Sequence, residues 1–167
     1  NLYLLPMVNP VGMALKTRSN GHGVDLMRNG QVRCEGKAAF LVGGHLLSKR
    51  LPWYRGNPLQ PEAETQALVR LVREKLFRGP FSLVLDCHSG FGVMDRLWFP
   101  YAKSREPVTH LAELFRLRQL LFDSYPYQPY QFEPQSQHYL CHGDLWDQLY
   151  DESLQTDTTF LPLTLEM

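Results

Sequence analysis

The sequence predicts an α/β fold, in which a mixed, largely parallel sheet is flanked by helices. Apolar runs of strand length alternate with amphipathic helical segments along the chain, as they do in βαβ units. The run at residues 81–85 is apolar except for Ser82, which is typical of a parallel sheet that is covered on both faces. The chain has 167 residues, which suffice for one hydrophobic core, so residues 1–167 are predicted to form a single domain.

The N-terminal part is predicted to contain one strand and one long loop. Leu2–Val8 is an apolar run that is stopped by Asn9 and Pro10, so we expect a buried strand there. Residues 10–36 are rich in glycine and polar side chains and show no sustained period, which predicts a loop. Loops of that length in compact domains are often functional.

A helix and a strand are predicted in the middle of the chain. Pro61 opens the helix, and Glu62 and Glu64 occupy its first turn, where the helix dipole favours acidic side chains. Its apolar face has helical spacing and consists of Leu68, Leu71, Val72 and Leu76. A Gly-Pro pair ends the helix, and the strand at Phe81–Leu85 follows.

The C-terminal part predicts two more helices and a last strand. Pro107–Phe122 carries apolar residues at helical spacing and is predicted as a helix. Residues 124–137 are rich in Pro, Tyr and Gln, which predicts a loop, and residues 143–153 are compatible with a short helix. Thr158–Met167 is predicted as the final strand.

The composition excludes several classes of protein. Lys and Arg number 17, as do Asp and Glu, so no overall charge favours nucleic acid or an anionic membrane, and any cationic site must be local. No apolar stretch approaches the ~20 residues of a membrane helix. Three cysteines make an odd count without paired spacing, which argues against a disulfide framework. The cysteine count favours a reducing compartment, so we expect a cytoplasmic location.

His88 follows the central apolar strand, at the strand end where open α/β sheets place their chemistry. Asp86 precedes it by two residues, so both side chains point to the same side of an extended chain. Ser89 and Gly90 then provide a turn that can present the ring to a cleft. A neutral imidazole there suits a metal ligand or a general base. From this motif alone, a hydrogen-bonded structural histidine is the alternative.

Two other features place charge in unusual positions. The glycine-rich loop at residues 9–30 contains Lys16, Arg18 and Arg28, and guanidinium groups bind carboxylates through paired hydrogen bonds. The alternative is a solvated basic loop. Glu166 lies in an apolar strand, where a carboxylate is costly unless it is paired or functional. The alternative is a glutamate that faces water at the strand end.

Taken together, these segments resemble the zinc metallocarboxypeptidase family, whose fold is carboxypeptidase A-like. The motifs match in the family's order over nearly the whole chain, beginning with "NPVG", which resembles the family's Asn-Pro-Asp-Gly turn. "KTRS" resembles the segment whose arginine polarises the scissile carbonyl, which implies Arg18 as a catalytic oxyanion stabiliser. "GVDLMRN" resembles Gly-Val-Asp-x-Asn-Arg-Asn, which implies Arg28 as the clamp for the substrate carboxylate. Met27 stands where the family has Asn, which puts the full clamp in doubt.

The later motifs imply the other site residues. "LDCHSG" resembles the strand that carries the third zinc ligand, which implies His88, and "TLEM" resembles the strand of the catalytic glutamate, which implies Glu166 as general base and acid. The spacing in "HYLCHGDLWDQ" is similar to that around the family's mobile capping tyrosine and the aspartate that floors its specificity pocket. This implies that Tyr139 and Asp147 bind the substrate.

The resemblance implies a zinc cofactor and a peptide or amino-acid-derived substrate with a free carboxylate. The family takes its first two zinc ligands from a His-x-x-Glu motif before the segment that "NPVG" resembles, and the residues before Asn9 contain no histidine. We therefore expect a fragment that is incomplete at its N-terminus, with the remaining ligands upstream and little activity by itself. Neither nucleic acid nor a membrane is expected as a partner, and the sequence does not reveal the oligomeric state.

Two alternatives remain open. Succinylglutamate desuccinylase and aspartoacylase proteins share the fold and a similar Asp-Leu-Asn-Arg stretch, but they cleave an N-acyl amino acid instead of a peptide. A compact pocket for small diacids would favour that function. A non-catalytic binding module, which kept the fold and lost the metal, is the second alternative, and Met27 supports it.

Overall fold

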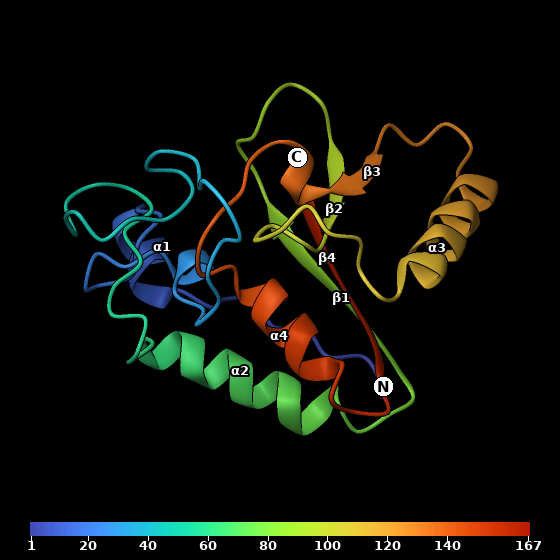
Figure 1. Ribbon diagram of the computed structural model, residues 1–167, viewed down its shortest axis with the longest axis horizontal. Helices are drawn as coiled ribbons and strands as arrows, with labels where there is room; N and C mark the ends of the chain where they lie inside the picture. Colours follow the sequence, from blue (N-terminus) through green and yellow to red (C-terminus); the bar gives the residue numbers. More distant parts are fainter.

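The computed structural model describes residues 1–167, which are arranged around one four-stranded sheet of order β1-β4-β2-β3 (Figure 1). β1 (Phe81–His88) pairs in parallel with β4 (Thr159–Glu166). β2 (Arg96–Phe99) pairs in parallel with β3 (Gln131–Pro134) and antiparallel with β4. The sheet is therefore mixed and mostly parallel, which confirms the predicted fold class.

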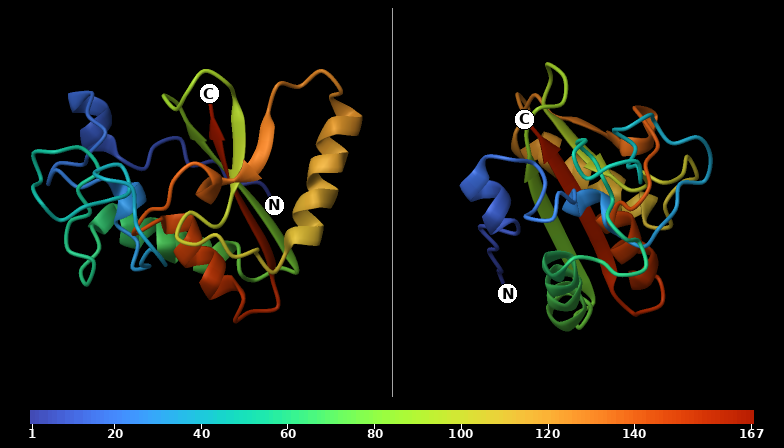
Figure 2. Two further views of the ribbon diagram at one scale, coloured as in Figure 1. Left: turned by 45° about the horizontal axis from the view of Figure 1, so that its top comes forward. Right: turned by 90° about the vertical axis from the view of Figure 1, so that its left-hand side faces the viewer.

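Helices lie on both sides of this sheet, as Figure 2 shows. The α-helices are α1 (Pro10–Leu15), α2 (Ala63–Lys75), α3 (Leu111–Ser124) and α4 (Leu145–Ser153). Two short 3₁₀ helices, η1 (Leu26–Arg28) and η2 (Gln135–Gln137), complete the elements. The three predicted helices are confirmed, although α3 begins several residues later than the sequence indicated.

The main hydrophobic core joins β4 and β2 to α4, with contributions from α2 and α3. Its best-buried members include Leu149 and Tyr150 of α4 and Phe160 and Leu161 of β4. The start of α4 is fixed locally, because Asp144 accepts hydrogen bonds from the amides of Trp146 and Asp147. The core thus holds α4 firmly against β4, and the residues at the start of α4 are carried to the carboxyl end of the sheet.

The predicted strand at Leu2–Val8 is wrong. The segment forms no regular element, and Leu2 and Leu4 are 95% and 87% exposed. An extended segment becomes a strand only where a neighbouring strand pairs with its backbone groups, and none of β1–β4 pairs with this one. The loop predicted at residues 10–36 is partly helical, because it contains α1 and η1.

β2 and β3 were not predicted from the sequence, and both are only four residues long. The predicted strand at Phe81–Leu85 is confirmed and extends to His88. The last strand is confirmed as Thr159–Glu166. None of the helices combines the length and the apolar character that a bilayer span requires.

Candidate functional site

His88 and Glu166 lie side by side at the carboxyl ends of neighbouring strands. They are register partners in the parallel pair β1 and β4. His88 Nδ1 lies 3.9 Å from Glu166 Oε1. Because parallel strands end at the same edge of a sheet, the last residue of each strand meets the other there. The sheet register therefore brings an imidazole and a carboxylate together.

Asp86 fixes the orientation of the His88 ring. His88 Nε2 lies 2.9 Å from Asp86 Oδ2, and the indole N–H of Trp146 donates to the same oxygen at 2.7 Å. Burial lowers the pKa of His88, but the hydrogen bond and charge of Asp86 outweigh it, so that the pKa is raised. Burial raises the pKa of Asp86, but its bonds to His88 and Trp146 outweigh that effect and lower it. With Nε2 bound to a carboxylate, the lone pair of a neutral His88 is on Nδ1.

Glu166 is buried and only partly satisfied. The residue is 8% exposed, and its Oε2 atom is fully buried without a hydrogen-bond partner. Burial raises its pKa, although the nearby charges of His88, Arg18 and Arg28 act in the opposite direction. A buried acceptor without a partner is rare in folded proteins and commonly marks a functional group.

Arg18 and Arg28 both reach this region, but their surroundings differ. Arg18 donates from Nε to Asp25 Oδ2 at 2.6 Å, and its side chain is 41% exposed. Asp25 also caps η1, because its other oxygen accepts from the amide of Met27. Asp25 therefore holds the Arg18 side chain against the short helix that carries Arg28.

Arg28 is buried, with 3% of its surface exposed. Its guanidinium donates to the carbonyls of Val42 and Met27 and to the hydroxyl of Tyr139, the last at 3.1 Å. Since a guanidinium has five N–H groups, one N–H on each terminal nitrogen is left for another acceptor. Asp144 Oδ2 lies 3.8 Å from Nη1 and partly balances the charge.

An aromatic wall lies beside Arg28. The ring of Phe91 packs against Trp98 at 4.8 Å and against Tyr139 at 5.8 Å between centroids. Behind this wall, Glu133 Oε1 accepts from Trp98 Nε1 at 3.4 Å and also pairs with Arg96 and His138. The wall is therefore anchored to β3 through one carboxylate.

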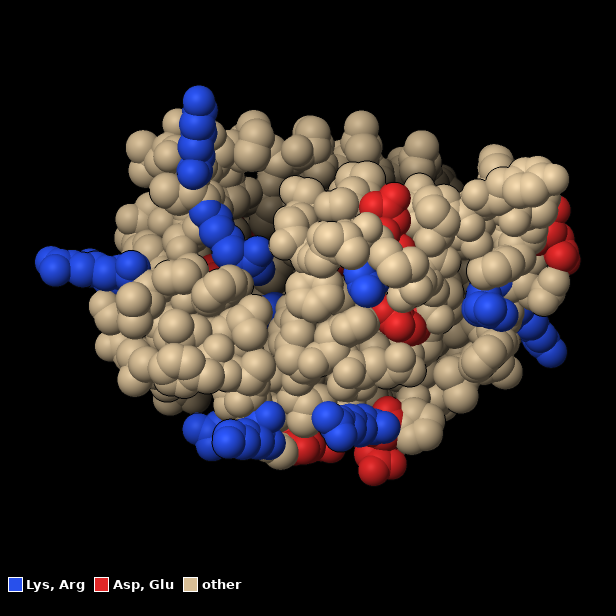
Figure 3. All heavy atoms as spheres, turned by 90° about the horizontal axis from the view of Figure 1, so that it is seen from above, with Lys and Arg blue, Asp and Glu red and all other residues tan.

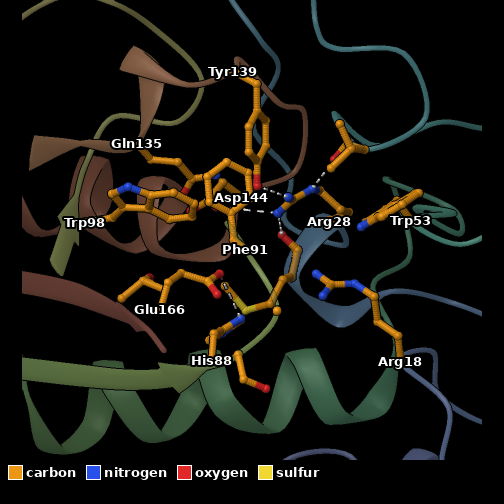
Figure 4. Close-up of a pocket in the computed structure, with 15 residues that line it drawn as sticks. Arg18, Arg28, Trp53, His88, Phe91, Trp98, Gln135, Tyr139, Asp144 and Glu166 are labelled. Atoms are coloured by element: carbon orange, nitrogen blue, oxygen red, sulfur yellow. Dashed lines mark hydrogen bonds and ion pairs between the residues drawn. The ribbon is translucent and has the colours of Figure 1, made fainter. Parts of the chain in front are cut away.

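These side chains line one pocket of about 100 Å³ (Figure 4). Five of the six residues that the sequence analysis selected lie on its wall: Arg18, Arg28, His88, Tyr139 and Glu166. Other wall residues were not predicted from the sequence, among which are Trp53, Phe91, Trp98, Gln135 and Asp144. Asp144 had a usable signal, because an aspartate that precedes a helix is a typical N-cap. The aromatic residues had none.

Asp147 does not lie on the wall of this pocket. Its carboxylate is fully buried and accepts hydrogen bonds from the amides of Ala102 and Lys103 at 2.8 and 2.6 Å. It lines a small adjoining cavity, which it shares with Asp144. The two aspartates differ in their positions on α4. Asp144 is the N-cap and lies on the pocket wall, whereas Asp147 is in the first turn of the helix and lies off that wall.

The residues present can supply only part of a zinc site. No group of three His, Cys, Asp or Glu side chains is arranged to hold a metal ion. His88 offers Nδ1 as one ligand, whereas a catalytic zinc site needs three protein ligands. One His-x-x-Glu spacing does occur, at His110 and Glu113, but His110 contacts the Tyr150 hydroxyl and neither residue lines the pocket. The chain therefore fits a single position of such a site.

Comparisons with known proteins agree with this fold. A family profile described as zinc carboxypeptidase matches residues 1–156. No curated protein matches. A carboxypeptidase A from Helicoverpa armigera has a TM-score of 0.69 and 19% identity, over 98% of this chain and 41% of that one. Thrombin-activatable fibrinolysis inhibitor has a TM-score of 0.61 and 21% identity, over 86% of this chain and 33% of that one.

The bovine form of that inhibitor, solved in complex with tick carboxypeptidase inhibitor, has a TM-score of 0.60 and 21% identity, over 86% of this chain and 45% of that one. The chain thus spans less than half the length of each of these structures. At these identities the similarity shows the fold, whereas the profile match covers most of the chain. The chain belongs to the zinc carboxypeptidase family.

Proposed function

We propose that this pocket takes part in the zinc-dependent hydrolysis of a C-terminal peptide or amide bond. The observation that carries the proposal is the convergence of His88, Glu166 and two arginines on one pocket. A bound zinc ion would supply Lewis-acid chemistry at such a site. His88 would contribute one ligand through Nδ1, held in place by Asp86. The other ligands would come from outside the residues present here.

Glu166 would act as the general base and acid. It would take a proton from the attacking water and return it to the leaving nitrogen. Its burial suits this role, because the raised pKa brings a carboxyl closer to the pH at which it exchanges protons. Arg18 is partly exposed and reaches the pocket, so it would stabilise negative charge on the carbonyl oxygen.

Arg28 and Tyr139 would hold the substrate end. The two N–H groups that Arg28 has left match a carboxylate, and the bond from Arg28 to the Tyr139 hydroxyl places the phenol next to the same ligand. Fixing that carboxylate decides which bond meets Glu166, because it sets the register of the substrate in the pocket. Asp147, which lies behind the wall, would act through the backbone of residues 102–103 and would not contact substrate.

The size of the pocket favours a second candidate as well. A cavity of about 100 Å³ is smaller than the ~300 Å³ typical of ligand pockets, so it accommodates little more than one amino-acid side chain. An N-acyl amino acid amidohydrolase would also use such a compact site. Both candidates require a free substrate carboxylate at Arg28, and they differ in what lies beyond the scissile bond.

The test compares three substrates in the intact protein that contains this chain. A peptide with a free C-terminus, the same peptide amidated at its C-terminus and an N-acyl amino acid are assayed for amine release. The carboxypeptidase proposal expects turnover of the first substrate only. Arg28→Ala should raise KM for the free-carboxylate substrate far more than Arg18→Ala, which should mainly lower kcat by about 10²-fold. Turnover of the amidated peptide at an equal rate would reject the carboxylate clamp.

A further inference from the structure

A short loop beside the pocket is closed at its base by a β-bridge and by hydrogen bonds. The two ends of residues 46–52, "LLSKRLP", are joined by an isolated β-bridge between His45 and Tyr54. The His45 ring accepts from the amide of Leu47 at 3.1 Å and donates to the carbonyl of Pro52 at 2.8 Å. The backbone of the 46–52 loop is therefore fixed where the loop begins and ends. Figure 1 shows this loop at the end of the molecule opposite α3.

The tip of this 46–52 loop exposes leucines. Leu46, Leu47 and Leu51 are 56%, 68% and 39% exposed. Single exposed apolar residues are normal on protein surfaces, but three within one preorganised loop form a small apolar tip. The hydrogen bonds of His45 hold the ends of the loop while these leucines face solvent. Apolar side chains held outward in this way fit an apolar partner.

The same loop is basic. Lys49 and Arg50 are exposed between the leucines, and the chain contains no Asp or Glu from residue 36 to residue 61. Glu62, the next acid along the chain, is bound by Asn20 and His22. Lys and Arg side chains accordingly project from this end of the molecule in Figure 3. The balanced net charge of the whole chain thus conceals a local cationic surface.

The loop is also connected to the pocket. Trp53 follows it directly and lines the pocket, with a positive φ of 65° that bulky residues rarely adopt. Gly23, in the loop that precedes η1, packs against the backbone of Lys49. A surface that binds the 46–52 loop would consequently lie close to the mouth of the pocket.

We propose that the 46–52 loop docks on an anionic lipid bilayer. The leucines would enter the boundary between headgroups and acyl chains, and Lys49 and Arg50 would bind lipid phosphates. A second copy of the chain is a poorer occupant, because it would present the same positive charge to this surface. Nucleic acid is also poorer, since exposed leucines offer no stacking surface to bases. This binding is peripheral, because only the loop would enter the bilayer surface, so it requires no membrane-spanning helix.

Co-sedimentation with vesicles tests the proposal. The protein should bind vesicles rich in phosphatidylglycerol and should not bind pure phosphatidylcholine. The double variant K49S/R50S should bind about thirty-fold less tightly, because each basic residue near a membrane contributes ~1 kcal/mol. The variant L46S/L47S should also lose binding. The control K75S/R78S removes the same charge from exposed positions at the end of α2 and should bind like the unmodified protein.

Three outcomes would overturn the proposal. The first is no binding to anionic vesicles by the unmodified protein. The second is an equal loss in the control, which would indicate general electrostatic attraction. The third is unchanged binding by L46S/L47S together with equal affinity for polyglutamate, which would indicate a site for an acidic polymer. Thermal melting of each variant monitors the fold, and a Leu47→Trp variant quenched by brominated lipid would locate the loop in the bilayer even where binding is weak.

Discussion

The indole of Trp146 donates a 2.7 Å hydrogen bond to the carboxylate of Asp86, which also binds the His88 ring at 2.9 Å. Trp146 belongs to α4, whereas Asp86 and His88 belong to β1. The core residues of α4 therefore set the position of a side chain on the neighbouring strand. Through Asp86, packing in the core determines how His88 faces the pocket.

Trp146→Phe tests this connection. The change keeps an aromatic ring in the core and removes the only indole donor to Asp86. Since a hydrogen bond to a charged group contributes ~1.5–3 kcal/mol, we expect the free energy of unfolding to fall by an amount in that range. Urea denaturation measures it. Trp53→Phe is the matched control, because no side-chain hydrogen bond of Trp53 is present, and an equal loss there would contradict the assignment.

Glu133 offers a second test, behind the aromatic wall. Its Oε1 atom accepts from Arg96 at 3.1 Å and from Trp98 at 3.4 Å, and it pairs with His138 at 2.6 Å. Glu133→Ala leaves these donors without their shared acceptor, so we expect a loss of ~1–3 kcal/mol in the free energy of unfolding. Glu133→Gln keeps an acceptor oxygen and should lose less. Equal losses in the two variants would show that charge alone matters.

The parts of the fold that the sequence predicted are those with local causes. The helices α2 and α3 follow from apolar periodicity, and α2 also follows from the acidic residues at its start. The strand at Leu2–Val8 was wrong because an apolar run does not reveal whether a pairing partner exists. β2 and β3 were missed because four-residue strands carry no period, and their pairing is set by residues far apart in the chain.

The candidate site divides in the same way. His88 and Glu166 could be selected because each carries a polar group at the end of an apolar strand, and the register of β1 and β4 then joins them. Trp53 and Phe91 could not, because loops bring them to the pocket and loop paths depend on the whole fold. Asp147 was chosen on spacing from Tyr139, whereas the helix cap places Asp144 at the pocket instead.

Gly143 should tolerate no side chain. Its φ is 68°, and a Cβ there would lie 1.9 Å from the carbonyl oxygen of Arg28. Gly143→Ala therefore combines a backbone cost of ~1–2 kcal/mol with a clash against main chain that cannot move freely. Gly90→Ala is the control, because Gly90 also has a positive φ of 106° but open space around it. We expect a clearly larger loss of thermal stability for Gly143→Ala, and similar losses would contradict the close approach.

His142 should make the stability of the protein depend on pH. Its Nδ1 atom accepts a hydrogen bond from the amide of Cys34 at 3.0 Å, so the folded state needs that nitrogen unprotonated. Burial, followed by the charges of Arg55 and Arg33, lowers the pKa of His142. The unfolded chain, with an ordinary histidine pKa of ~6.5, then binds more protons than the folded state between the two pKa values. The contribution of His142 is therefore fully present above about pH 6.5 and is lost as the pH falls through the folded-state pKa.

The measurement is the difference in melting temperature between the unmodified protein and His142→Gln, at pH values above and below about 6.5. A glutamine can still accept from Cys34 but does not titrate. The melting temperature of the unmodified protein should fall relative to that of His142→Gln as the pH drops below about 6.5. In that range His142 takes up a proton in the unfolded chain but not in the folded state, and this favours unfolding. His88 and His22 have raised pKa values and change stability in the opposite direction, but both are present in each protein and cancel in the difference. A difference that stays constant over the range would show that the pKa of His142 is the same in the folded and the unfolded state, which would contradict the lowered pKa.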